Sequence, residues 1–93
     1  PIVVNSEDIR KKPEEILTKL CNRINLGFQK SMLSWPKGGN KKDGVWASHW
    51  YGSAHKSVGF SGSENNLPNL KGRNANLVEA SMPHYSSLLK FAI

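Results

Sequence analysis

Residues 35–51, WPKGGNKKDGVWASHWY, combine groups that bind anions with a set of aromatic rings. Lys37 precedes the pair Gly38-Gly39, and Lys41 and Lys42 follow shortly after. Ammonium groups supply positive charge, and backbone N–H groups beside glycine are accessible to a phosphate or sulfate oxygen. The pattern predicts an exposed anion-binding loop. The alternative is a solvated lysine surface with no ligand.

The aromatic residues that follow the loop are spaced as on a helix. Trp46, Trp50, Ala54 and Val58 come at steps of four, which predicts a helix over about 44–58. Asp43 is suited to cap its start and Gly59 to end it in a left-handed conformation, with Gly52 as its weakest point. We expect the two tryptophans mainly to be buried and to anchor the loop. Stacking on a purine is the alternative.

Other reactive side chains give weaker patterns. Cys21 falls on an apolar stripe and is interpreted as a small core thiol. His49 and His55 are six residues apart, on different helix faces, and no Cys or carboxylate cluster completes a metal site, so no metal is predicted. His49 is interpreted as a surface or hydrogen-bonding histidine rather than a proton-transfer group. No catalytic residue is predicted, and neither GxxxxGK[ST] nor GxGxxG occurs.

Charge and composition restrict the class of protein. The net charge is +6, concentrated in the middle third, which favours phosphate, sulfate or nucleic acid partners. One cysteine in 93 residues cannot form an internal disulfide. No apolar run approaches the ~18–20 residues of a membrane span, and no secretory leader is visible. We therefore expect a cytoplasmic protein that does not contact a membrane.

Further elements are expected on both sides of the loop. Ile2–Val4 predicts a short strand, and 6–9 a turn or single helical turn. Pro13, Glu14 and Glu15 predict the start of a helix whose apolar stripe runs to about residue 24 and which ends at Asn25 and Gly27. A polar linker is expected at 61–66. A second apolar stripe over 69–93 predicts a helix that Pro83 kinks or breaks.

One strand and about three helices cannot close a layered domain, because a lone strand leaves backbone groups unpaired. The predicted fold class is therefore α/β, with this mostly helical chain as the edge portion of a larger sheet protein.

Read in order, these segments resemble the C-terminal part of sulfotransferase-family proteins. The resemblance starts at IVVNSEDI and KPEEIL and covers essentially the whole chain. A subgroup sometimes labelled branched-chain aminotransferase-like is more similar still. It shares a Met-Leu-x-Trp, a Gly-rich basic loop, an Asp-Gly-Val-Trp-Ala, a Trp-Tyr and a Ser-x-Gly-Phe, which match MLSW, KGGNKK, DGVWA, WY and SVGF here.

The resemblance implies a three-layer P-loop NTPase-like fold. Residues 1–93 would be the C-terminal part of one sulfotransferase-like domain, without its N-terminal phosphate loop. Family members transfer a sulfuryl group from 3′-phosphoadenylyl sulfate (PAPS), without a metal, to a hydroxyl or amine of a small molecule. A late Arg-Lys-Gly…Gly-Asp-Trp element of cytosolic relatives contacts the 3′-phosphate. The order Lys37, Gly38, Gly39 and then DGVW is similar, although the Arg-Lys pair is missing and Gly-Asp is reversed.

We therefore expect a basic lid loop at the 3′-phosphate end of PAPS, with Lys37, Gly38, Gly39, Lys41 and Lys42 as the cofactor-binding residues. The chain would belong to a longer enzyme and be inactive alone. Two rival interpretations stay open: a non-catalytic nucleic-acid-binding module, which no sequence motif supports, and a P-loop relative that transfers another group. The acceptor and the oligomeric state do not follow from the sequence.

Overall fold

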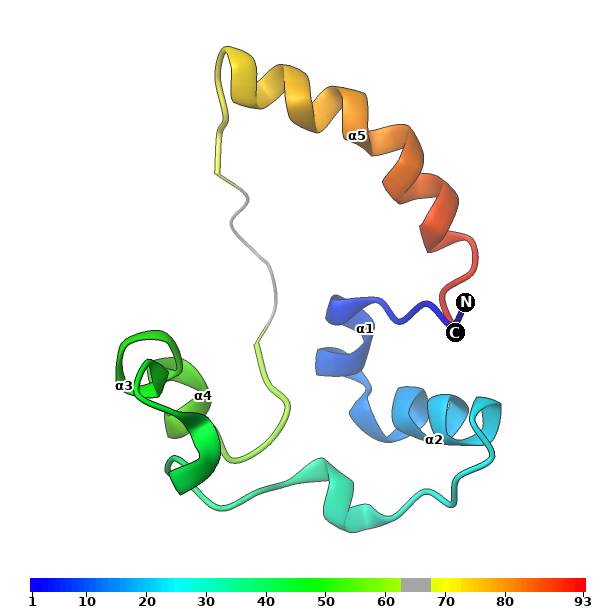
Figure 1. Cartoon of the computed structure of the whole chain (residues 1–93). Coiled ribbons are helices and arrows are strands. Elements are labelled where there is room, and N and C mark those ends of the chain that lie inside the picture. The colour runs from blue at the N-terminus through cyan, green and yellow to red at the C-terminus, as the bar shows by residue number, and fades with distance from the viewer. Residues whose placement is uncertain (63–67) are drawn as a thin grey trace.

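A computed structural model describes residues 1–62 and 68–93 (Figure 1). The predicted mostly helical content is confirmed for these residues, while positions 63–66 of the predicted linker, and Leu67, lie outside them. The helices are α1 (Ser6–Lys11), α2 (Pro13–Arg23), α3 (Ala47–Trp50), α4 (Gly52–Lys56) and α5 (Arg73–Leu89), with the 3₁₀ helices η1 (Lys30–Leu33) and η2 (Lys41–Asp43).

Helices α1 and α2 begin where their sequence predicts. The Asn5 side chain accepts a hydrogen bond from the Glu7 amide at 3.0 Å and so caps α1. Pro13 lies in the first turn of α2. Proline has no backbone N–H, and the first turn of a helix does not need one. Asn25, with φ 57°, lies just beyond the end of α2. These predicted boundaries are confirmed to within two residues.

The strand predicted at Ile2–Val4 does not form. Val3 makes an isolated parallel bridge with Ala92, and the Ile93 amide donates to the Val3 carbonyl at 3.1 Å. Asn5 already caps α1, so the extended segment ends before a ladder can develop. No strand occurs in the described residues, so the α/β class is not visible in them; Figure 1 shows the two termini side by side.

The helix predicted over 44–58 is also wrong. Two short helices, α3 and α4, replace it, and they meet at Tyr51, whose φ of −105° and ψ of 20° interrupt the regular turn. The interruption lies beside Gly52, the predicted weak point, because glycine has low helix propensity. Gly59 does not cap a helix. It pairs with Ser34, where a side chain would lie 3.1 Å from the Leu33 carbonyl oxygen.

Helix α5 passes through Pro83 without a break. Proline removes one backbone donor and crowds the preceding turn, but the turns on both sides remain helical. Figure 1 shows the axis of α5 to curve along its length. Of the two predicted outcomes, a broken helix is therefore wrong.

The chain encloses little core. Only Ile16, Cys21 and Ala47 are buried among the described residues, and no residue of α5 is. The radius of gyration is 16.6 Å, whereas a compact domain of this length would have about 12 Å. The accessible surface is 7991 Å², against roughly 5,400 Å² for a compact monomer of this mass. Helix α2 packs on α1 and η1, and α3 packs on α4, but large apolar faces remain exposed.

Candidate functional site

The loop predicted to bind an anion, residues 36–43 and hereafter the basic loop, has a defined backbone. Gly38 adopts a φ of 116°, a conformation that residues with a side chain rarely adopt. The loop ends in η2, which Asn40 caps by accepting from the Lys42 amide at 3.0 Å. This capping places the end of the loop in a regular turn.

The three lysines of the basic loop are exposed to solvent. No ion pair joins Lys37, Lys41 or Lys42 to a carboxylate anywhere in the described ranges. Unpaired ammonium groups on a structured loop keep their full charge available for a phosphate or sulfate group.

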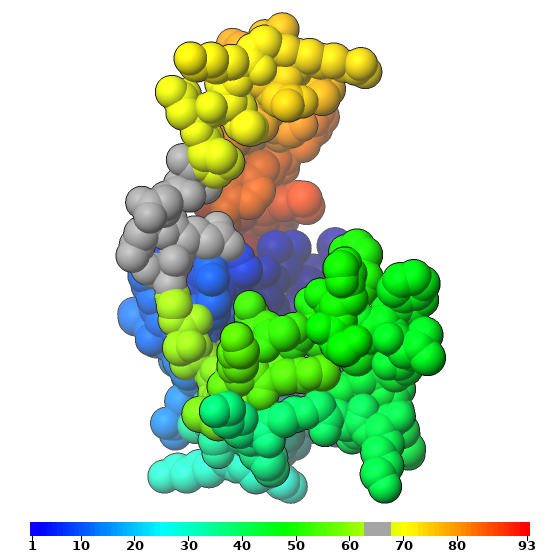
Figure 2. Space-filling model, turned by 90° about the vertical axis from the view of Figure 1, so that its left-hand side faces the viewer, coloured from blue at the N-terminus to red at the C-terminus, as the bar shows by residue number. Residues whose placement is uncertain are grey.

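Two segments, residues 34–35 and 57–60 and hereafter the neck, lie side by side. They close the stretch of chain between them, which contains the basic loop, α3 and α4. Ser34 and Gly59 form an antiparallel bridge, and the Trp35 amide donates to the Val58 carbonyl at 3.0 Å. The indole Nε1 of Trp35 donates to Ser57 Oγ at 3.0 Å. The neck therefore makes the segment between its two arms a closed unit, and Figure 2 shows the green residues around α3 and α4 as a projecting lobe.

The indole ring of Trp35 also packs on the neck. It meets the Phe60 ring edge-on, with the ring centroids 5.2 Å apart. This geometry is favourable for aromatic pairs. Trp35 is thus the tryptophan that anchors the loop.

Trp46 and Trp50 do not have the anchoring role that their spacing predicts. They are 71% and 72% exposed, because the single helix face that would have buried them is divided between a turn and α3. Neighbouring Val45 and Tyr51 are exposed as well. An aromatic surface therefore lies beside the basic loop in place of a buried face.

Asp43 has a different partner from the one that its position predicts. Its carboxylate does not cap a following helix. Oδ2 accepts from the Asn40 amide at 2.8 Å and lies 3.1 Å from His55 Nε2. The hydrogen bond from the Asn40 backbone, and then that from His55, hold the pKa of Asp43 below its ordinary value.

His55 also contacts the two glycines of the predicted site. The Gly38 amide donates to the His55 carbonyl at 2.8 Å, so this N–H is already used within the protein and is not free for an anion. Gly39 lies against the imidazole ring. From the sequence, His55 stood out only as a candidate metal ligand. Its separation from Asp43 by twelve residues gave no local pattern by which to find the contact.

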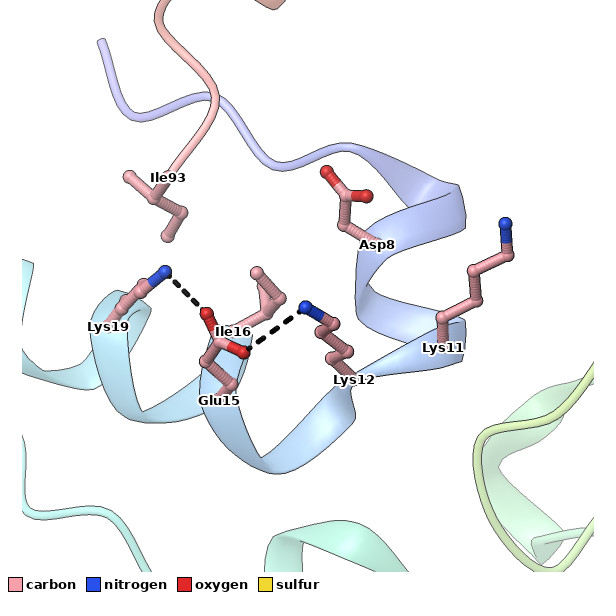
Figure 3. A pocket seen from close by; sticks show the side chains of 7 residues that line it. All are labelled: Asp8, Lys11, Lys12, Glu15, Ile16, Lys19 and Ile93. Atoms are coloured by element: carbon pink, nitrogen blue, oxygen red, sulfur yellow. Dashed lines mark hydrogen bonds and ion pairs between the residues drawn. The ribbon is translucent and has the colours of Figure 1, made fainter.

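A hollow lies between α1, α2 and the C-terminus and was not predicted (Figure 3). It has a volume of ≈ 230 Å³ and is lined by Asp8, Lys11, Lys12, Glu15, Ile16, Lys19 and Ile93. Glu15 pairs with Lys19 at 2.7 Å and with Lys12 at 3.8 Å. The hydrogen bond from Lys19 is the main cause that lowers the pKa of Glu15. Lys11 pairs with Glu7 outside the lining, at 2.6 Å, so each lysine of the hollow already has a carboxylate partner. The lysines of the basic loop have none among the described residues, and the basic loop is therefore the stronger anion site.

Cys21 lies in the core, and the histidines belong to no metal-binding cluster in the described residues. Cys21 is buried, with its Sγ 3.9 Å from Met32 Sδ, as expected of a core thiol. Over residues 1–62 and 68–93, no three His, Cys, Asp or Glu side chains are grouped to hold a metal.

Within the same ranges no helix has the length and apolar character needed to cross a bilayer.

The profile of the sulfotransferase domain family matches residues 1–92. The chain belongs to this family, as its resemblance predicted. It is 38% identical over 88 residues to branched-chain-amino-acid aminotransferase-like protein 1 of Arabidopsis thaliana, and 34% identical to protein 2 of the same name. Each alignment covers 95% of this chain and 16% of the relative, so the chain spans about a sixth of their length. No solved structure matches the chain significantly.

Proposed function

We propose that this chain is the C-terminal part of a sulfotransferase domain and that its basic loop closes over the 3′-phosphate end of PAPS. Membership of the sulfotransferase domain family supports a role in sulfuryl transfer. The phosphate loop and the catalytic base would lie in other parts of the enzyme, and the chain by itself would be inactive. We propose a cytoplasmic enzyme whose acceptor is a small molecule with a hydroxyl or amine.

The observation that carries this proposal is the set of unpaired lysines on a structured loop. Lys37, Lys41 and Lys42 would neutralise the nucleotide phosphates. Gly38 and Gly39 would contribute by carrying no side chain that keeps the phosphates away from the loop, since the Gly38 amide is already bonded to the His55 carbonyl. The sulfuryl group is highly charged during transfer. Positioned cations therefore contribute more to its transfer than covalent chemistry does.

The exposed apolar surface supports the placement within a larger domain. Helix α5 presents a stripe of half-exposed side chains, Leu77, Val78, Met82, Tyr85, Leu88 and Leu89. Contiguous apolar surface of this kind is typical of an interface that another part of the protein covers. We propose that the remaining layers of the sulfotransferase domain cover it.

Isothermal titration of the full-length protein with 3′,5′-ADP tests the assignment. The triple variant Lys37→Ala, Lys41→Ala, Lys42→Ala should bind at least tenfold more weakly. A hydrogen bond to a charged group contributes about 1.5–3 kcal/mol, and about 1.4 kcal/mol corresponds to a factor of ten. The matched control, Lys30→Ala, Lys71→Ala, Lys90→Ala, removes the same charge outside the loop and should keep wild-type affinity.

Unchanged affinity in the loop variant would overturn the assignment. Oligonucleotide binding that falls steeply with salt, without affinity for 3′,5′-ADP, would instead favour the nucleic-acid-binding alternative. Release of 3′,5′-ADP from PAPS with an acceptor present distinguishes sulfuryl transfer from transfer of another group.

A further inference from the structure

Three contacts between α4 and the basic loop involve a single residue, His55. Its Nε2 lies 3.1 Å from Asp43 Oδ2, and its carbonyl accepts from the Gly38 amide at 2.8 Å. Its ring faces Gly39 so closely that a Cβ there would lie 2.8 Å from Cε1. The three partners cover most of the length of the basic loop, so His55 holds both its start and its end.

We propose that His55 is a positioning residue for nucleotide binding, which fixes the basic loop so that its lysines are presented together. This inference rests on the proposed function. His55 itself contacts no ligand in this role. Its imidazole acts through Gly39 and Asp43, while its main-chain carbonyl holds Gly38 by a bond that any residue at this position would keep.

His55 keeps the basic loop ordered before a ligand binds. A loop with two glycines and flexible lysines loses much conformational freedom when it binds a ligand, and fixing it beforehand removes part of that cost. The neck fixes only the two ends of the segment. His55 adds contacts within the loop itself, at Gly38, Gly39 and Asp43.

His55 also affects the charge of the basic loop through Asp43. Asp43 is the carboxylate nearest in sequence to Lys41 and Lys42, and an ion pair with either would weaken the site. Its Oδ2 is instead used by the Asn40 amide and by His55. An imidazole with its proton on Nε2 donates to this oxygen whether or not the ring is charged. His55 thereby helps to keep the only acidic group of the basic loop away from its lysines.

Limited trypsin digestion of the full-length protein tests the contact without a ligand, because trypsin cleaves after Lys37, Lys41 and Lys42. His55→Ala should raise cleavage in the loop at least fivefold, with cleavage after Lys71 as the internal reference. Affinity for 3′,5′-ADP should fall by a similar factor. The control Ser53→Ala, an exposed position of the same helix, should change neither quantity.

A conservative pair of variants separates positioning from packing. The amide nitrogen of a glutamine reaches the place of Nε2, whereas that of an asparagine corresponds to Nδ1. His55→Gln should therefore keep the bond to Asp43 and retain most of the affinity, while His55→Asn should resemble His55→Ala. Equal loss in all three would show that the hydrogen bond to Asp43 does not help to position the loop, and would overturn that part of the proposal.

A second variant tests the close approach at Gly39. Gly39→Ala should loosen the loop, because the new methyl displaces the imidazole ring from Asp43. The double variant Gly39→Ala, His55→Ala should cleave no faster than His55→Ala alone, since both act on one contact. Additive effects would contradict that contact.

The lysine variant and the His55 variant together distinguish failure of this inference from failure of the proposed function. If the lysine triple variant loses affinity but His55→Ala keeps both wild-type affinity and wild-type cleavage, His55 has no positioning role. Faster cleavage with unchanged affinity overturns it equally. If the lysine variant itself keeps full affinity, the proposed function fails and the positioning role fails with it, whatever the digestion shows.

Discussion

His55 Nε2 and Asp43 Oδ2 lie 3.1 Å apart although twelve residues separate them in the chain. The contact joins the end of the basic loop to helix α4. The same carboxylate oxygen also accepts from the Asn40 amide in the capping box of η2, whereas the predicted cap of a following helix does not form. Together with the Trp35 contacts at the neck, it gives an otherwise glycine-rich and lysine-rich segment a fixed form.

The pH dependence of Asp43 follows from its hydrogen bonds. They lower its folded pKa below the ordinary value of 3.8. The carboxylate therefore contributes stability that is fully present above that value and is lost as the pH falls through the folded pKa. We expect the loop contacts to persist at pH 4 and to weaken only in stronger acid.

Carbon-13 NMR titration of the Asp43 carboxyl measures this directly. In His55→Ala the midpoint should rise but stay below 3.8, because the Asn40 amide is the larger cause of the lowered pKa. A wild-type midpoint at or above 3.8 would show that these hydrogen bonds do not persist in solution.

Features that depend on neighbouring residues in the chain could be predicted from the sequence. The start of α2 was predictable because Pro13, Glu14 and Glu15 act within one turn. The burial of Cys21 followed from an apolar stripe on that same helix. The basic loop was predictable as an exposed segment for similar reasons, since Pro36 and the glycines disfavour regular structure wherever the chain folds.

The contacts that hold the loop depend on distant partners. The spacing of Trp46 and Trp50 fits a helix face, but it does not reveal that the helix is interrupted at Tyr51. Likewise, the β-branched residues Ile2–Val4 favour a strand, yet the described partner, Ala92, provides one bridge only. The strand, the tryptophan face and the His55 contact all required information beyond the local sequence.

The indole hydrogen bond of Trp35 should contribute to the stability of the neck. Trp35→Phe keeps a ring against Phe60 but removes the donor to Ser57 Oγ. We expect a loss of about 0.5–1.5 kcal/mol in the free energy of unfolding of the full-length protein, measured with urea.

Trp50→Phe is the matched control for this change, because its side chain is 72% exposed, and it should have little effect. The double variant Trp35→Phe, Ser57→Ala should lose less than the sum of the single variants. Strict additivity would show that the two side chains do not interact.

The small core beside α2 should depend on Ile16, which is 4% exposed. Ile16→Ala leaves a cavity as well as losing buried surface, and we expect a loss of about 2–4 kcal/mol in the free energy of unfolding. Ile24→Ala, at a position that is 45% exposed on the same stripe, should cost much less. Equal losses would indicate that the rest of the full-length protein buries both side chains alike.

Helix α5 should become more stable when Pro83 is replaced. Proline lacks the N–H that would donate to the carbonyl four residues earlier, and its ring crowds that carbonyl. Alanine restores the donor and has the highest helix propensity. Because α5 is already helical on both sides of this position, Pro83→Ala needs no rearrangement to form the missing hydrogen bond.

We expect Pro83→Ala to raise the stability of the full-length protein by about 1–3 kcal/mol and to slow amide hydrogen exchange in the second half of α5. Ser86→Ala is the control, because it places alanine at an exposed position of α5 without changing the backbone donors. A destabilised Pro83→Ala variant would indicate that the curvature of α5 seen in Figure 1 is needed for its packing in the complete domain. In that case the proline would be retained for the shape it gives the helix, and the exposed apolar stripe of α5 would fit only a curved surface.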